Sequence, residues 1–172
     1  EDAVKEMANA RVDAAVIHPP ESLADQIDAN ELAVEAVRKY PDKFCILGYF
    51  DLENPEGLEI VKNWRKRPGM LGFRYTLARA DQEAWWSDGS LDWFWSACEE
   101  EGLPVGLQAG AHLPEFRKIA EGYPGLKLHI DHQGRVGRKT DDEAFTNLKD
   151  LLDLATLPNV AVKLSGLPTY SS

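Results

Sequence analysis

Short runs of apolar and β-branched residues alternate along the chain with longer amphipathic stretches. The runs have the length and composition of buried β-strands, and the stretches repeat their apolar positions with the period of an α-helix. The pattern predicts six strands, at Val12–Ile17, Phe44–Phe50, Met70–Thr76, Pro104–Gln108, Leu126–Asp131 and Asn159–Leu164. It predicts helices at about Leu23–Tyr40, Pro55–Arg67, Leu91–Glu101, Leu113–Gly122 and Asp141–Ala155, with Glu1–Ala10 as a further helix at the start.

Strands that are each joined to the next by a helix are typical of a parallel α/β sheet. An open sheet would usually carry a glycine-rich phosphate loop after its first strand, but here that strand ends in His18-Pro19-Pro20. A complete (β/α)8 barrel needs about 250 residues. Six strands in 172 residues would therefore be strands two to seven of eight. We expect an incomplete (β/α)8 TIM barrel, with residues 1–172 forming a single partial barrel domain.

The two ends of the chain also favour a fragment. It begins at Glu1 without a methionine and stops at Ser172 directly after a strand-like segment. A six-stranded part of a barrel leaves two sheet edges open, so we expect residues 1–172 to be unstable without the flanking segments.

Composition narrows the class of protein. Nineteen Lys and Arg residues against 29 Asp and Glu residues give a net charge of −10, which argues against a nucleic-acid partner. No apolar run approaches the roughly 18 residues of a membrane helix, and no signal peptide opens the chain. Cys45 and Cys98 lie in apolar contexts, which favours reduced thiols over a disulfide. We expect a cytoplasmic protein without a membrane partner, and no feature indicates its oligomeric state.

Polar residues collect where the predicted strands end, which is where barrel enzymes carry their chemistry. Three of the long polar side chains stand one layer above a very small residue, and we expect this to leave room for ligands. The loop at 78–89 is too long for a simple turn and should lie on the same face. The polar strand-end residues are His18, Tyr49, Asp51, Arg74, Tyr75, Gln108, Asp131, His132, Lys163 and Ser165.

The histidines differ in their expected roles. His132 could act as an acid or base, or polarise a carbonyl; the alternative is a structural histidine bonded to Asp131 or to backbone. His129 has the opposite parity, so we expect it to face the helical layer in a structural role. For His112 the residues leave a ligand role at the rim and a surface position equally open, and His18 could line the mouth or anchor its loop.

The cationic residues suggest an anionic substrate. Arg74 at a strand end needs an anion, which could be a substrate or a carboxylate of the protein. Arg135 follows His132 closely enough to reach the same ligand, unless it is a solvated loop residue. Lys163 could form a salt bridge at the end of the barrel or act as a Schiff-base nucleophile, and we favour the salt bridge. A few such cations can attract an anion despite the negative net charge.

Four segments resemble the amidohydrolase-related family of barrel hydrolases and decarboxylases, also called amidohydrolase 2. They follow one another in the order that the family shows on strands four to seven. The segments are Gly69–Arg74 (GMLGFR), Leu103–Gln108 (LPVGLQ), Leu128–Arg135 (LHIDHQGR) and Asn159–Gly166 (NVAVKLSG). The resemblance implies a (β/α)8 barrel, and His132 matches the family histidine on strand six that acts in catalysis or binds metal.

Many members of that family bind a metal through a His-x-His pair on strand one, a histidine on strand five and an aspartate on strand eight. Strands one and eight are absent here, and Gln108 stands where the strand-five histidine is expected. This substitution points to the lactonase branch, similar to 2-pyrone-4,6-dicarboxylate lactonase, which works without a divalent metal. We therefore expect no metal ligand and no cofactor in this chain, although zinc stays possible if the missing strands supply ligands.

The resulting prediction is a hydrolase that opens a lactone or a similar cyclic ester of a small carboxylated molecule. His132 is the expected catalytic residue, and the expected substrate-binding residues are Arg74, Gln108, Arg135 and Lys163. Sugar lactonases of the same family are a close second, and a metal-dependent decarboxylase is third. A Schiff-base lyase that uses Lys163, or an inactive fragment that binds a partner, is the alternative from another class.

Overall fold

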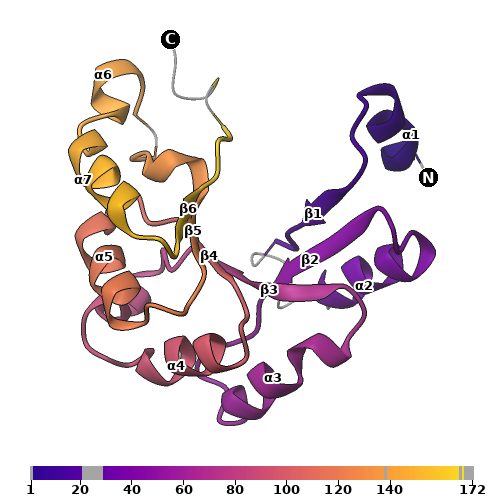
Figure 1. The fold of residues 1–172 in the computed structure, drawn as a ribbon, viewed down its shortest axis with the longest axis horizontal. Helices are drawn as coiled ribbons and strands as arrows, with labels where there is room; N and C mark the ends of the chain where they lie inside the picture. The colour runs from indigo at the N-terminus through magenta and orange to yellow at the C-terminus, as the bar shows by residue number, and fades with distance from the viewer. Residues whose placement is uncertain (1, 21–28, 138, 167, 169–172) are drawn as a thin grey trace. The chain divides into compact units, whose positions relative to one another are not determined.

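The computed structural model describes residues 2–20, 29–137, 139–166 and 168, and the chain divides into two compact units, Glu1–Arg74 and Tyr75–Ser172. Strands and helices alternate in both units, and the strand order in the sheet follows the chain, β1 to β6 (Figure 1). The α/β prediction is confirmed, and a sequential parallel order is that of a (β/α)8 barrel. The single-domain prediction stays a prediction.

The first unit is a three-stranded parallel sheet covered by helices. Strand β1 pairs with β2, and β2 pairs with β3. Residues 23–28 of the helix expected at 23–40 lie outside the described residues. The elements are α1 (Asp2–Asn9), β1 (Ala15–Ile17), α2 (Ala29–Lys39), β2 (Phe44–Gly48), α3 (Gly57–Asn63), the 3-10 turn η2 (Trp64–Lys66) and β3 (Met70–Tyr75), whose last residue belongs to the second unit.

Aromatic packing holds the first unit together. The rings of Trp64 and Phe73 lie 4.3 Å apart between centroids, and Trp64 donates a hydrogen bond from Nε1 to the carbonyl of Gly72. At Gly48 a Cβ would stand 2.9 Å from the Trp64 ring, so this strand position accepts only glycine without movement. Burial of Trp64 and Phe73 thus fixes the distance between η2 and the sheet.

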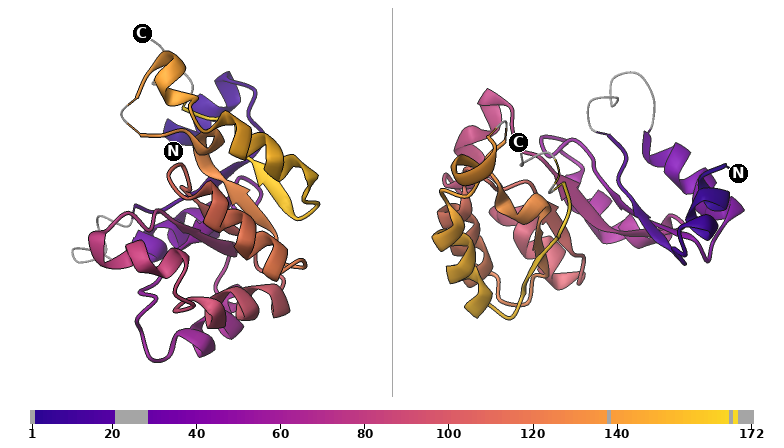
Figure 2. Two further views of the ribbon diagram at one scale, coloured as in Figure 1. Left: turned by 90° about the vertical axis from the view of Figure 1, so that its left-hand side faces the viewer. Right: turned by 90° about the horizontal axis from the view of Figure 1, so that it is seen from above.

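The second unit repeats the same arrangement. Strand β4 pairs in parallel with β5, and β5 pairs with β6. Figures 1 and 2 show α5 and α7 side by side along these strands. Its elements are η3 (Ala80–Trp86), α4 (Asp92–Glu100), β4 (Val105–Leu107), α5 (Leu113–Gly122), β5 (Leu128–Ile130), the turn η4 (Asp131–Gly134), α6 (Asp141–Ala144), α7 (Leu148–Asp153), η5 (Leu154–Thr156) and β6 (Val160–Val162).

The core of the second unit lies between the strands and their helices. Leu128 and Ile130 of β5 are fully buried, as is Phe116 of α5.

Both cysteines are free thiols, as the sequence predicts: Cys98 is buried on α4, and Cys45 is half-buried on β2 of the first unit. Burial raises the pKa of both thiols above the ordinary cysteine value, which keeps them protonated.

Two predicted elements differ from the structure. The single helix expected at 141–155 is divided into α6, α7 and η5. The break falls at Asn147, whose φ of −98° and ψ of 16° are not helical and whose side chain bonds to neighbouring loops. The long loop expected at 78–89 contains the 3-10 helix η3. In the described part of the chain, none of the helices is both long and apolar enough to cross a bilayer.

Candidate active site

One face of strands β4 to β6 carries the polar residues of the second unit. The register pairs Gly106 with His129 and His129 with Ala161, so these three positions share one face. Two residues further along, Gln108, Asp131 and Lys163 follow on that same face, at the carboxyl ends of the strands. The buried residues Leu128 and Ile130 take the opposite face, toward the helices.

His129 therefore does not face the helical layer, and that prediction is wrong. A Cβ at Gly106 would stand 2.2 Å from the imidazole of His129, so the ring occupies the space that the glycine leaves on the polar face. The prediction failed because it took the parity from His132, which lies beyond the end of β5. Gly106, the small residue one layer below Gln108, does leave space on this face, but the side chain of His129 occupies that space.

A buried carboxylate organises this face. The side chain of Asp131 is 0% exposed, and its Oδ1 lies 3.3 Å from Lys163 Nζ and 3.7 Å from His129 Nε2. A carboxylate removed from water needs such partners, because an unpaired buried charge costs several kcal/mol. The favoured interpretation of Lys163, a salt bridge at the strand ends, is confirmed, and its substrate-binding role stays a prediction.

His132 occupies an unusual backbone position directly after β5. It has φ 52° and ψ 40°, and Gln133 follows with φ 53° and ψ 24°, both in the left-handed region that side chains disfavour. Such strain, of order 1–3 kcal/mol for each residue, persists only where the surroundings impose it and is concentrated at functional sites. At His132 this backbone conformation takes the side chain out of the two-residue alternation of β5.

The imidazole of His132 is held by the segment that follows β6. Its Nδ1 lies 2.9 Å from Oγ of Ser165, and the ring is half-buried. This contact fixes one ring nitrogen, and among the described residues no hydrogen bond to the other nitrogen, Nε2, is seen. A histidine oriented through Nδ1 can use Nε2 either to donate a hydrogen bond to a carbonyl or to accept a proton.

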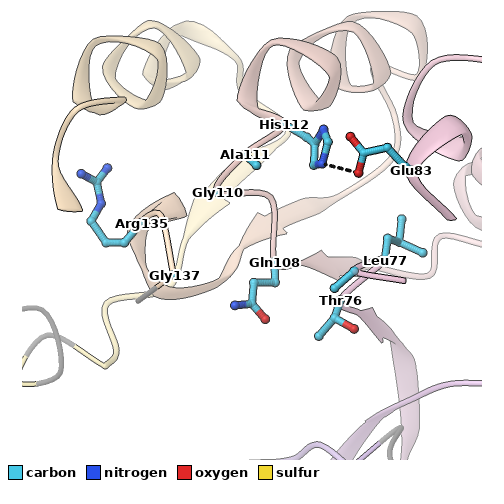
Figure 3. A pocket seen from close by; sticks show the side chains of 10 residues that line it. Thr76, Leu77, Glu83, Gln108, Gly110, Ala111, His112, Arg135 and Gly137 are labelled. Carbon is cyan, nitrogen blue, oxygen red and sulfur yellow. Dashed lines mark ion pairs between the residues drawn. The ribbon is translucent and has the colours of Figure 1, made fainter. Parts of the chain in front are cut away.

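The loop after β5 is tied down by its own side chains. Gln133 donates from Nε2 to the carbonyls of Lys163, at 2.8 Å, and Ser165, at 3.2 Å. Arg135 is buried, donates to the carbonyls of Gln133 and Ala144, and packs its guanidinium 4.7 Å from the ring of Phe145. Its side chain points away from the neighbouring pocket (Figure 3). The substrate-binding role of Arg135 stays a prediction that this geometry does not favour.

A pocket of about 380 Å³ lies beside these residues. Two loops that border it touch at Gly110, where a Cβ would stand 2.3 Å from the carbonyl oxygen of Arg135. Asn147 joins the same loops, donating to the carbonyls of Gly110 at 2.7 Å and Gly134 at 2.6 Å. The pocket is lined by Thr76, Leu77, Ala78, Glu83, Gln108, Gly110, Ala111, His112, Arg135 and Gly137 (Figure 3).

His112 belongs to this pocket and not to open surface. Its Nε2 lies 3.4 Å from Oε2 of Glu83, and its ring stacks on Trp86 at 4.7 Å between centroids and 14° between planes. The sequence left His112 undecided between a ligand role and a surface position. The stacking comes from η3, inside the long loop that was expected to lie on the active-site face.

Arg74 and His18 meet in the first unit. Arg74 donates to His18 Nε2 at 2.7 Å, and His18 Nδ1 lies 3.2 Å from the carbonyl oxygen of Leu47. Since arginine can only donate, Nε2 must accept, so Nδ1 carries the proton and the ring is neutral. Tyr49 donates its hydroxyl to the carbonyl of Pro20 in the same region. His18 thus anchors its loop and orients the guanidinium of Arg74.

The described residues do not fit a metal ion. No group of three or more His, Cys, Asp or Glu side chains comes together among the residues that the structure describes. One pair, His129 and Asp131, shares the carboxylate oxygen with the ammonium of Lys163, which a metal would have to displace. Zinc sites need four such donors or three and a water.

Three contributors to the site were missed or misassigned from the sequence: His129, Glu83 and Asn147. Counting the alternation from the residues of β5 and not from His132 would have put His129 on the same face of the sheet as Asp131. Glu83 lies on an irregular 3-10 helix and Asn147 interrupts a helical pattern, so periodicity carries no signal for either residue.

The chain matches the amidohydrolase family over residues 2–172. It belongs to that family. Two curated relatives are L-fucono-1,5-lactonases: one from Burkholderia multivorans, 30% identical over 132 residues, and one from Burkholderia ambifaria, 27% identical over 126 residues. Each match covers 73% of this chain, and 44% and 43% of those relatives, so the chain spans less than half of their length.

Solved structures share the fold of this amidohydrolase. A Burkholderia multivorans amidohydrolase with bound zinc superposes with a TM-score of 0.80 at 24% identity, over 99% of this chain and 60% of that one. A probable 2-pyrone-4,6-dicarboxylic acid hydrolase from Acinetobacter baumannii, with citric acid bound, gives 0.70 at 19% identity, over 99% and 61%. A TIM-barrel protein from Bordetella bronchiseptica gives 0.72 at 17% identity, over 98% and 59%. These likenesses confirm an incomplete barrel.

Proposed function

We propose that the intact amidohydrolase opens a small lactone by hydrolysis. The observation that carries this proposal is the placement of His132, whose Nδ1 is held by Ser165 while the strained backbone presents the ring beyond β5. An imidazole fixed in this way suits a carbonyl whose oxygen gains negative charge during the reaction. The two L-fucono-1,5-lactonases among the relatives support the same class of reaction.

In the proposed reaction, water adds to the carbonyl carbon of the lactone. The bond from that carbon to the ring oxygen then breaks, the ring oxygen gains a proton, and the product is an open hydroxy acid. A proton on Nε2 of His132 would stabilise the oxyanion, provided that Ser165 donates its hydroxyl to Nδ1. The resemblance places a carboxylate on an eighth strand, which this chain does not include, and we assign to it the proton of the attacking water.

We further propose that a carboxylate on the substrate, where present, binds to Arg74. This guanidinium lies at a strand end and is oriented by the neutral ring of His18. Arginine binds a carboxylate through two parallel hydrogen bonds, which a lysine cannot reproduce.

The experiment is a survey of lactones with the intact protein in weak buffer. Each ring opened at neutral pH releases one proton, which a pH indicator records. We expect turnover of six-membered lactones above the rate in buffer, and no release of carbon dioxide from carboxylated phenols. Turnover of the phenols without any lactone turnover would assign the protein to the decarboxylases of the same family. Turnover of neither class would refute the proposal.

A further inference from the structure

We infer that the pocket beside the strand ends binds hydroxyl groups of the substrate, and that Glu83 and His112 determine which hydroxylated substrates are accepted. The inference rests on the proposed function and names a specificity site for it. It arises from the polar groups of the pocket, its position and its charge (Figure 3).

The pocket offers donors and acceptors together. The exposed amide of Gln108 supplies both, and no side-chain hydrogen bond of Gln108 is seen within the described part of the chain. Glu83 uses one carboxylate oxygen for His112 and keeps a second acceptor on a side chain that is 68% exposed. A hydroxyl group is itself a donor and an acceptor, so paired groups of this kind satisfy it fully.

The position of the pocket follows from the strand register. The register of β4 and β5 ends with Leu107 paired with Ile130, and Gln108 and Asp131 are the next residues of these two neighbouring segments, with about 4.8 Å between paired strands. His132 follows directly after Asp131. In the inferred binding mode the substrate carbonyl lies against His132 and the remaining ring atoms lie at Gln108 and the pocket.

The charge of the pocket argues against a carboxylate there. Glu83 is negative, and His112 contacts that same carboxylate. The guanidinium of Arg135, whose residue also lines the pocket, turns toward the carbonyls of Gln133 and Ala144. A substrate carboxylate in this pocket would be repelled by Glu83, and the two basic residues of the described lining, His112 and Arg135, already contact groups of the protein; a neutral hydroxyl would not be repelled.

The lining residues of the pocket are preorganised. His112 is stacked on Trp86, so its ring cannot rotate freely. Leu77, which also lines the pocket, has φ 46°, a strained value for a bulky residue. Asn147 holds the two loops at Gly110 and Gly134. Rigid binding groups lower the entropic cost of binding, which favours a ligand site over an incidental hollow.

The test compares two lactones that differ only in hydroxyl groups. With the intact protein, kcat/KM is measured for an aldono-1,5-lactone, which has hydroxyls around its ring, and for δ-valerolactone, which has none. Glu83→Gln keeps the shape of the side chain and removes its charge. We expect it to lower the ratio of the two kcat/KM values about tenfold, the size of one charge-assisted hydrogen bond.

Asp81→Asn is the matched control. Asp81 is an exposed acid on the same 3-10 helix, bonded to Arg79 and outside the pocket. We expect it to leave the ratio unchanged. An unchanged ratio in Glu83→Gln, or an equal fall in both variants, overturns the inference.

A second arm separates this inference from the proposed function. A hexopyranose sugar carries ring hydroxyls but no ester, so its binding can be measured by calorimetry whether or not lactones are hydrolysed. We expect Glu83→Gln to weaken this binding about tenfold relative to the wild-type protein. Equal affinities, or no binding to either protein, would refute the hydroxyl site even if lactones are opened. Weakened binding without lactone turnover would refute the proposed function alone.

Discussion

The ammonium of Lys163 lies 3.3 Å from Oδ1 of Asp131, a carboxylate side chain with no solvent exposure. Asp131 and Lys163 directly follow the last residues of the adjacent strands β5 and β6, next to the turn that carries His132. Their contact closes the polar face of the strands and fixes the segment that carries His132. Removing one partner should therefore affect stability more than an ordinary surface ion pair does.

We predict that Lys163→Met lowers the free energy of unfolding by about 1–3 kcal/mol, because the buried carboxylate loses a partner. Denaturant titration of the intact protein measures the change. Lys149→Met is the control, since Lys149 pairs with Asp153 on the exposed surface of α7, and we expect a change below about 0.5 kcal/mol. In the double variant Asp131→Asn/Lys163→Met the buried charge is removed as well, so much of the lost free energy of unfolding should be regained. Equal effects of the two lysine substitutions would contradict the assignment.

Gly106→Ala tests the position of His129. The new Cβ would stand 2.2 Å from the imidazole, so the ring must move away from the strand, at a cost of about 1–3 kcal/mol. Gly122→Ala at the end of α5 has nothing within 4 Å of the new Cβ and should leave stability unchanged or slightly higher. The melting temperatures of the two variants measure these changes in stability. An unchanged melting temperature in Gly106→Ala would show that the ring of His129 does not lie against Gly106.

Asn147→Ala tests the connection between the loops that border the pocket. The variant loses hydrogen bonds to the carbonyls of Gly110 and Gly134, which should cost about 1–3 kcal/mol and loosen both loops. Hydrogen exchange should speed up in both segments, while lactone turnover falls. Asn63→Ala, which removes a bond within the exposed surface of α3, should change neither. Unchanged exchange at both loops would show that Asn147 does not hold them.

The sequence predicted the fold well because each strand and helix carries its own period. Leu113–Gly122 was placed at its observed bounds, and the other described strands and helices lie within or near their predicted ranges. Errors occurred where side chains bond to backbone outside their own element. Asn147 interrupts an otherwise helical pattern because it serves two loops, and no periodicity reports that.

The site was predictable in its residue types but not in its contacts. His132, Asp131, Lys163 and Ser165 were recognised as strand-end residues, yet β5 ends at Ile130 and the alternation of faces does not continue through His132. The left-handed turn that follows cannot be read from period two, so the face of His129 was assigned wrongly. The burial of Arg135 depends on Ala144, the last residue of α6, and on Phe145, which follows it; the sequence placed both in a longer helix.

Treatment with a chelator tests the donor set of the strand ends. Gln108 directly follows β4, where the resemblance expects a histidine, and an amide is a poor zinc ligand beside imidazole or thiolate. Asp131 is already paired with Lys163. We predict that the intact protein keeps lactone hydrolysis after exhaustive treatment with a strong chelator. Loss of activity that zinc or manganese restores would show that a metal takes part.

The central claim is that His132 stabilises the reacting carbonyl, and His132→Asn tests it most directly. Asparagine tolerates the left-handed conformation of this position better than most residues, so the fold should persist with an unchanged melting temperature. We predict that kcat for lactone hydrolysis by the intact protein falls at least about a hundredfold, the usual contribution of a positioned acid or base, while KM changes little. A variant that keeps its fold and more than about a tenth of the wild-type kcat would contradict the claim.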